Sequence, residues 1–220
     1  MRYAMHADDR PDGHLFENEL LTQRLVEPGG EEQTSDADEL LYVLAGDGGL
    51  QVGDRRHAIG PGTSVFLARG TAWSADGVRA LSVLVHDPPP ASAPFAVRDL
   101  NAEEKGTATA GRQFVLGATP EVGCASATQF IGLVPPGRAP DHFHTYDEVI
   151  YVLEGEGALE IGGETAPLRA GSCVHLPARL VHCLANTADS ELRLLGVFRP
   201  AGSPAEAYYP DGTRAVVPDS

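Results

Sequence analysis

Three histidines and one glutamate in the C-terminal half of the chain have the spacing of a metal site. His142 and His144 are two residues apart, so on a β-strand both imidazoles point to the same face. Glu148 follows after a three-residue spacer, and His182 lies further along, after Pro177. Three imidazoles and one carboxylate suit a divalent ion such as Fe, Mn, Ni, Zn or Cu. Such a ligand set leaves the remaining positions of an octahedral ion open for water, oxygen or substrate.

The neighbours of these residues suggest supporting roles. Tyr146 and Asp141 flank the histidines and are candidates for orienting the imidazole N–H groups. His175 is interpreted as a histidine of the core or the rim, and Cys183 as a small buried residue, because it points away from the face of His182 on a regular strand. No residue identifies itself as a general acid or base, so the catalytic residues stay unassigned.

An internal repeat organises the chain around these residues. Residues 39–54 (ELLYVLAGDGGLQVGD) and 148–163 (EVIYVLEGEGALEIGG) share eight of sixteen positions at an offset of 109. A period of this length corresponds to a whole domain, so we predict two tandem copies of one fold. The predicted boundaries are residues 1–97 for the first domain, 98–112 for a linker with one short helix at 99–105, and 113–220 for the second domain.

Short apolar runs broken by glycine or proline indicate the elements of each copy. Runs such as ELLYVL, SCVHLP and ELRLLGVF are four to eight residues long and rich in β-branched residues or leucine. No long stretch holds a helical spacing of apolar residues, so the chain is predicted to be all-β. The repeated segments LAGDGGLQVGDR and LEGEGALEIGGE are typical of two strands joined by a glycine-rich turn.

The first copy lacks the histidines. The positions that correspond to the four candidate ligands are Gln33, Ser35, Glu39 and Trp73. Glutamine and serine are weak ligands and tryptophan is none, so we expect no transition metal in this copy. Because the glutamate persists where the histidines are lost, Glu148 is also expected to serve the fold.

Composition and charge narrow the class of protein. The chain of 220 residues has a formal net charge of −15, which argues against nucleic acid or an anionic membrane as a partner. Three cysteines without a CxxC pair argue against a disulfide scaffold or a Cys-type zinc finger. The polar start and the absence of a long apolar run predict a soluble, cytoplasmic protein whose partner is a small-molecule substrate.

The pattern of the second copy resembles the cupin family. Its first motif corresponds here to Gly137, His142, His144, Glu148 and Gly155, with the gap before His142 one residue shorter than usual. Its second motif corresponds to Pro177, His182 and Asn186, with Arg179 where the family has glycine, a departure that concerns the shape of the turn. The resemblance covers roughly residues 20–85 and 115–200, so the chain looks like a bicupin whose second copy keeps the metal motif intact and whose first copy is degenerate.

The resemblance implies two tandem cupin barrels of the double-stranded β-helix, or jelly-roll, type. It also implies one divalent metal per chain, held by His142, His144, Glu148 and His182, with Fe, Mn or Ni favoured and Zn or Cu as further options. The ligand set resembles that of quercetin dioxygenases, acireductone dioxygenases and oxalate decarboxylases. We therefore expect a dioxygenase-type enzyme, with a non-redox isomerase, cyclase or lyase and a non-catalytic binding protein as alternatives, and a homodimer as the oligomeric state.

The C-terminal tail holds the last sequence signal. Residues 205–220 read AEAYYPDGTRAVVPDS, and the aromatic pair Tyr208 and Tyr209 before Pro210 favours docking of this tail over free disorder.

Overall fold

The computed structural model describes residues 3–215, and within this range the regular elements are β-strands and three short 3-10 helices. The helices are η1 (Ala7–Asp9), η2 (Thr109–Gly111) and η3 (Pro120–Val122). The predicted all-β class is thereby confirmed. Among the described residues, no helix has the length and apolar character needed to cross a bilayer. Cys124, Cys173 and Cys183 are free and buried.

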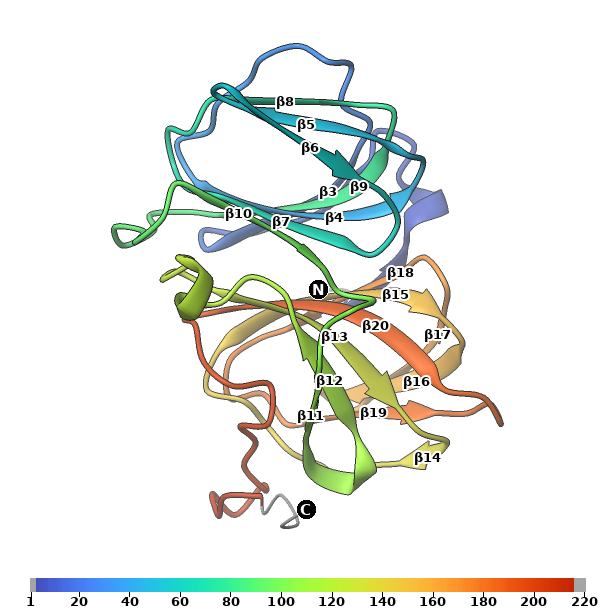
Figure 1. Cartoon of the computed structure of the whole chain (residues 1–220). Coiled ribbons are helices and arrows are strands. Elements are labelled where there is room, and N and C mark those ends of the chain that lie inside the picture. The colour runs from blue at the N-terminus through green and yellow to red at the C-terminus, as the bar shows by residue number, and fades with distance from the viewer. Residues whose placement is uncertain (1–2, 216–220) are drawn as a thin grey trace. The chain divides into compact units, whose positions relative to one another are not determined.

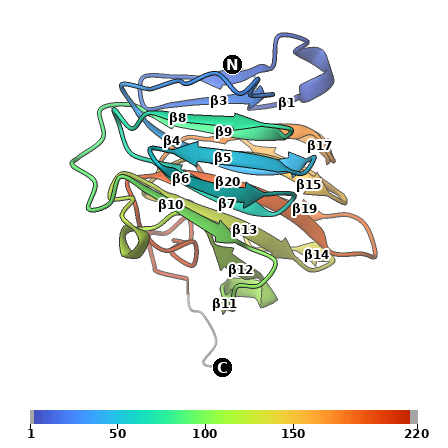
Figure 2. The ribbon, with the colours of Figure 1, turned by 45° about the horizontal axis from the view of Figure 1, so that its top comes forward.

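The chain folds into two compact units, each built from two antiparallel sheets. The C-terminal unit comprises residues 3–11, 104–116 and 128–215, and the N-terminal unit comprises residues 12–103 and 117–127. Within each unit the strands of a sheet lie side by side and the two sheets form layers (Figure 1, Figure 2). Each unit buries an apolar core of its own, with Leu159 fully buried in one and Leu50 in the other.

The C-terminal unit contains a seven-stranded and a four-stranded sheet. The larger sheet has the strand order β1-β18-β15-β20-β13-β12-β11, with bounds Ala4–His6, Ser172–Leu176, Asp147–Glu154, Leu192–Arg199, Thr128–Val134, Gln113–Leu116 and Lys105–Thr107. The smaller sheet has the order β14-β19-β16-β17, with bounds Gly137–Arg138, His182–Asn186, Glu156–Ile161 and Glu164–Arg169. Alternation of buried and exposed residues along β16 shows one face turned toward the core.

The N-terminal unit contains a six-stranded and a three-stranded sheet. The larger has the order β10-β7-β4-β9-β3-β2, with bounds Phe95–Asp99, Thr63–Leu67, Asp38–Ala45, Arg79–Val85, Leu21–Val26 and His14–Glu17. The smaller has the order β6-β5-β8, with bounds Arg55–Ile59, Gly48–Val52 and Trp73–Asp76.

Local geometry follows the sequence repeat. Gly46 and Gly155 stand at equivalent positions of the repeat and have φ of +84° and +91°, a left-handed conformation that glycine adopts without strain. The pairing of β4 with β9 and of β15 with β20 shifts register at the same repeat position, between Val43 and Ala45 and between Val152 and Glu154. Identical residues in the two segments therefore make the same turn and bulge.

The segments around the predicted boundaries take part in the sheets. Residues 3–11 belong to the C-terminal unit because β1 pairs with β18, with Met5 opposite Cys173. Residues 117–127 belong to the N-terminal unit, where the Ser126 hydroxyl donates to Asp38 Oδ2 at 2.6 Å. Each unit therefore draws on stretches of chain that lie on both sides of a predicted boundary.

The predicted short helix at residues 99–105 is wrong. β10 ends at Asp99, whose carboxylate accepts the amide N–H of Asn101 at 3.0 Å and closes a turn instead. Lys105 then begins β11, which pairs with β12 in the larger sheet of the C-terminal unit. The linker predicted at residues 98–112 thus contributes a strand and η2 to this unit.

Candidate metal centre

Backbone pairing brings the three candidate histidines together. His142 and His182 form an isolated antiparallel bridge, in which each amide N–H donates to the carbonyl of the other residue at 3.0 and 2.8 Å. His144 lies two residues further along, and one ring nitrogen from each histidine lies within 4.8 Å of those of the other two. The predicted convergence of these imidazoles is therefore present in the structure.

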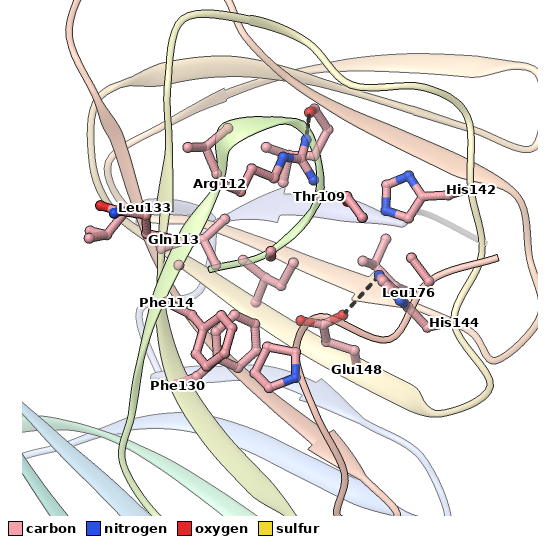
Figure 3. A pocket seen from close by; sticks show the side chains of 18 of the residues that line it. Thr109, Arg112, Gln113, Phe114, Phe130, Leu133, His142, His144, Glu148 and Leu176 are labelled. Carbon is pink, nitrogen blue, oxygen red and sulfur yellow. Dashed lines mark hydrogen bonds and ion pairs between the residues drawn. The ribbon is translucent and has the colours of Figure 1, made fainter. Parts of the chain in front are cut away.

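Glu148 reaches the same pocket from β15. Its Oε2 lies 4.0 Å from His144 Nε2, and its side chain lines the pocket with His142 and His144 (Figure 3). His182 lines the same pocket. Glu148 is only 3% exposed, and no other acidic side chain of the described residues lines this pocket. Its carboxylate is therefore placed to complete a ligand set of three nitrogens and one oxygen.

Backbone carbonyls fix the orientation of all three rings. Nδ1 of His142 donates to Pro140 O at 2.9 Å, Nδ1 of His144 to Glu206 O at 2.7 Å, and Nδ1 of His182 to Leu180 O at 2.9 Å. A proton on each Nδ1 leaves the lone pair on Nε2, which is the atom that a metal takes. The residues present thus fit a divalent ion.

Burial sets the charge state of the cluster. Desolvation is the main cause that lowers the pKa of each histidine, and neighbouring imidazoles also lower the pKa of His144 and that of His182, which falls to about 4. The imidazoles are therefore neutral at pH 7, as metal binding requires. Burial raises the pKa of Glu148 to about 8, so its carboxylate lies in a site where a positive charge would be favourable.

Much of the rest of the pocket wall is apolar. The cavity has a volume of about 80 Å³ and is lined on its apolar side by Phe114, Phe130, Ile150, Leu176, Leu184 and Leu194. Such walls exclude water and admit a small ligand.

Tyr146 and Asp141 do not orient the imidazole N–H groups, so that prediction is wrong. The ring of Tyr146 stacks on His144 at 4.7 Å between centroids and on Phe198 at 3.8 Å. Asp141 instead pairs with Arg138 at 2.7 Å on the surface. The orienting groups are main-chain carbonyls, which carry no signal in the sequence.

The other two neighbours lie where the sequence predicted. His175 is 7% exposed and lies on β18, where its Nε2 is 2.9 Å from Asp147 Oδ1. Cys183 is fully buried, and its thiol donates to the carbonyl of Ala139. Neither residue lines the metal pocket, so both act in the packing of the unit.

Sequence reasoning missed Arg112, which lines the metal pocket together with the candidate ligands. It lies just before β12, in the stretch that the sequence suggested to be a linker. An isolated arginine carries no motif, so only its position in the fold reveals it.

The C-terminal tail docks beside the metal ligands. Tyr208 pairs with Phe143 through two backbone hydrogen bonds of 2.9 Å, and their rings stack at 5.5 Å. Pro204 and Ala207 line the pocket, and the Glu206 carbonyl holds the His144 ring. The docking predicted for residues 205–220 is confirmed up to residue 215, and residues 216–220 lie outside the described range.

Removal of residues 204–220 should weaken metal binding. The truncation deletes the Glu206 carbonyl, and loss of such a partner of a metal-bound histidine typically costs about 10- to 100-fold in affinity. Metal affinity by chelator competition would measure the effect. Thr145→Val serves as the control, since it removes only the contact of Thr145 Oγ1 with the Glu206 carboxylate. Equal affinities of the truncated and full chains would contradict the role of this carbonyl.

Arg179 occupies the turn before His182 in a left-handed conformation, with φ of +64°. Its amide N–H donates to the His144 carbonyl at 2.7 Å, so the turn is tied to a ligand residue. This is the position where the sequence motif favours glycine.

Arg179→Gly should stabilise the protein slightly. Relief of the left-handed strain, about 1–2 kcal/mol, exceeds the added freedom of the unfolded chain, about 0.4–1 kcal/mol. Thermal unfolding should show a rise in Tm of about 1–3 °C. Ala178→Gly provides the control, because Ala178 has no positive φ and its replacement should lower Tm. A lower Tm for Arg179→Gly would show that its side chain stabilises the turn.

The N-terminal unit has the same bridge without the ligands. Gln33 and Trp73 form the isolated bridge that corresponds to that of His142 and His182. Glu39 accepts a hydrogen bond from the Ser82 hydroxyl at 2.5 Å and from Arg24 Nη2 at 3.2 Å. The buried carboxylate here is neutralised by a guanidinium.

Comparison with known proteins covers the region of the candidate ligands. Residues 130–198 match the family model described as a cupin domain. The chain is 36% identical over 76 residues to polyketide synthase CurC of Streptomyces cyaneus, and 32% identical over 77 residues to L-ectoine synthase of Aliivibrio fischeri. Each alignment covers 34% of this chain, and they cover 49% and 60% of the respective relatives. The chain therefore matches about half the length of these relatives.

Solved structures share the fold over most of the chain. AerE from Microcystis aeruginosa has a TM-score of 0.69 at 12% identity and covers 84% of this chain and 90% of its own. A protein of Pseudomonas aeruginosa described as putative glyoxylate-induced has a TM-score of 0.70 at 18% identity, covering 89% and 77%. Oxalate decarboxylase of Bacillus subtilis has a TM-score of 0.67 at 14% identity, covering 91% and 73%. Residues 130–198 of this chain thus match a cupin-domain model, and these solved structures share the fold of the chain.

Proposed function

We propose that this chain is a metal-dependent enzyme that acts on a small oxygenated molecule in the pocket of the C-terminal unit. His142, His144, His182 and Glu148 would hold one divalent metal, with Fe, Mn or Ni favoured. The observation that carries the proposal is the arrangement of the three imidazoles, whose Nδ1 atoms are all engaged by carbonyls. The solved Bacillus subtilis oxalate decarboxylase, which shares the fold, is described with Mn(II) centres.

When bound, the metal would supply a Lewis acid or a redox centre. The chain's own residues position the ligand: the apolar walls, including Phe130 and Leu176, exclude water, and the carbonyl-bound imidazoles keep a fixed geometry. The reaction class we propose first is dioxygenase-type oxidation, since four protein ligands do not fill an octahedral shell.

A second candidate is a non-redox cyclase, isomerase or lyase. Sequence relatives named L-ectoine synthase and polyketide synthase CurC favour it, because these names describe synthases and not oxygenases. In this reaction a carbonyl of the substrate is polarised and a proton is moved without consumption of oxygen.

We also interpret the N-terminal unit as a second, degenerate cupin barrel. The support is the shared bridge, turn and bulge at an offset of 109 residues, although the family model matches only residues 130–198. In this interpretation the unit serves as scaffold, since Glu39 is already paired with Arg24.

Metal analysis followed by oxygen uptake tests the proposal. Plasma mass spectrometry of protein purified without an affinity tag should find about one Fe, Mn or Ni per chain, as a single four-ligand site predicts. Oxygen consumption with small enols and phenols would support the dioxygenase, and turnover without oxygen uptake would support the non-redox reaction. A chain that takes up no metal, and is not stabilised by added metal, would overturn both candidates and leave a non-catalytic binding protein.

A further inference from the structure

Arg112 is held at the pocket by an unusual turn. Ala110 has φ of +56° and ψ of +38°, and Gly111 has φ of +71°, so two successive residues adopt left-handed conformations just before Arg112. The Ala108 amide donates to the Arg112 carbonyl at 2.8 Å and closes the turn. A left-handed alanine is strained, and such strain persists where the surroundings require it. The turn brings Arg112 to the pocket lined by His142 and Glu148 (Figure 3).

Most N–H donors of the Arg112 guanidinium have no hydrogen-bond partner among the described residues. It carries five N–H donors, and in the described part of the chain its side chain makes one hydrogen bond, from Nη2 to the Leu184 carbonyl at 2.5 Å. No carboxylate of the described residues lies within 4.0 Å of it. Arg24, Arg98 and Arg138 of the same chain each have a carboxylate partner. The position of Arg112 at the pocket therefore leaves its remaining donors for a ligand.

The charges of the pocket favour an anion. A metal-bound imidazole is neutral, so a divalent ion with the Glu148 carboxylate would leave one net positive charge, and Arg112 at the same pocket adds a second. In a partly desolvated cavity, a charge of this kind attracts anions far more strongly than in water. The chain as a whole has a net charge of −15, so the charge of this pocket is opposite in sign to that of the protein.

The shape of the donor group selects the kind of anion. A guanidinium presents paired, coplanar N–H groups that match the two oxygens of a carboxylate. The cavity of about 80 Å³ and the apolar walls formed by Phe114 and Leu194 admit a compact organic acid.

We propose that Arg112 is a specificity-determining residue that binds the carboxylate of a small substrate whose adjacent oxygen lies at the metal ligands. The proposal rests on the proposed function, because the second oxygen needs a metal held by His142, His144, His182 and Glu148.

Binding of glycolate to the cobalt-loaded full chain tests this inference. Glycolate carries a carboxylate beside a hydroxyl, and glycolamide is its neutral analogue. Both are titrated against the visible absorption of bound Co²⁺ in the wild type and in Arg112→Gln, Arg112→Lys and Arg169→Gln. Arg169 is the matched control, because it lies on β17 of the same unit and does not line the metal pocket.

Arg112→Gln should keep one cobalt per chain and bind glycolate at least about tenfold more weakly. Arg112→Lys keeps the charge but loses the paired donors. Its affinity for glycolate should therefore lie between those of Arg112→Gln and the wild type. Arg169→Gln should change the affinity less than twofold, and glycolamide should bind weakly and equally to all variants.

The possible results distinguish a failure of the role of Arg112 from a failure of the proposed function. Unchanged glycolate affinity in a cobalt-loaded Arg112→Gln protein would overturn the role of Arg112 and leave the proposed function intact. A wild type that binds no cobalt at the histidines would overturn the proposed function and this inference with it. If circular dichroism shows that Arg112→Gln does not fold, Arg112→Lys decides: wild-type glycolate affinity in that variant would overturn the inference.

Discussion

His182→Ala should remove the bound metal from the chain. The substitution deletes one of the three ring nitrogens that lie within 4.8 Å of one another, while the bridge to His142 survives because it is formed by backbone atoms. Loss of an outer partner alone costs about 10- to 100-fold in metal affinity, so loss of a ligand should cost at least about 100-fold. Metal content by plasma mass spectrometry should fall from about one per chain to near zero.

Thermal unfolding gives a second measure of the same effect. Metal at about 100 times its Kd should stabilise the wild type by about 2.7 kcal/mol through mass action, and should not stabilise His182→Ala. His14→Ala is the matched control, because His14 is half exposed and lies in the N-terminal unit. A variant that retains one metal per chain and a full metal-dependent rise in Tm would exclude His182 from the ligands.

The part of the site that the sequence revealed is the part encoded in side-chain spacing. His142 and His144 share a face because they are two residues apart, and His182 reaches them through a backbone bridge that is repeated by Gln33 and Trp73. Short apolar runs and glycine turns likewise indicated strands rather than helices, and the structure confirms the all-β class.

The features of the site and fold that could not be predicted from the sequence are those that depend on the folded backbone. Carbonyls of Pro140, Leu180 and Glu206 orient the rings, and any residue type could supply them. The pairing of β1 with β18 joins segments that are far apart in the chain, and nothing local in Ala4–His6 indicates its partner strand. Arg112 lies in the stretch between the two repeats that was interpreted as a linker, and a single cation there carried no signal.

Relative to Glu148→Gln, the metal-free wild type should lose stability as the pH rises from about 4.5 to about 8. Burial raises the pKa of Glu148 from 4.5 to about 8, so over this range the folded state keeps a proton that the unfolded state releases. A raised pKa gives stability that is complete below the unfolded value and is lost as pH passes through the folded value. At about 1.4 kcal/mol for each pH unit, the loss amounts to at most about 5 kcal/mol.

Urea unfolding of the wild type and Glu148→Gln at pH 4.5 and pH 8, with a chelator present, measures the difference in their free energies of unfolding. The two should be of similar stability at pH 4.5, where Glu148 is protonated like the neutral glutamine, and the variant should be more stable at pH 8. Subtracting the variant from the wild type cancels the titration of the histidines, whose lowered pKa acts in the opposite direction. A pH-independent difference would show that the Glu148 carboxylate is stabilised by its surroundings without metal.

Glu39→Gln provides the contrast, because the equivalent carboxylate of the N-terminal unit already has a cationic partner. Its loss leaves Arg24 without an ion pair and Ser82 without its carboxylate acceptor, so the variant should be destabilised by about 1–3 kcal/mol at pH 8. Added metal should then separate the two sites further. With metal bound, the wild type should become more stable at pH 8 than Glu148→Gln, because the metal neutralises a carboxylate that burial alone disfavours. Added metal should leave the effect of Glu39→Gln unchanged, since the Arg24 guanidinium already supplies the positive charge there.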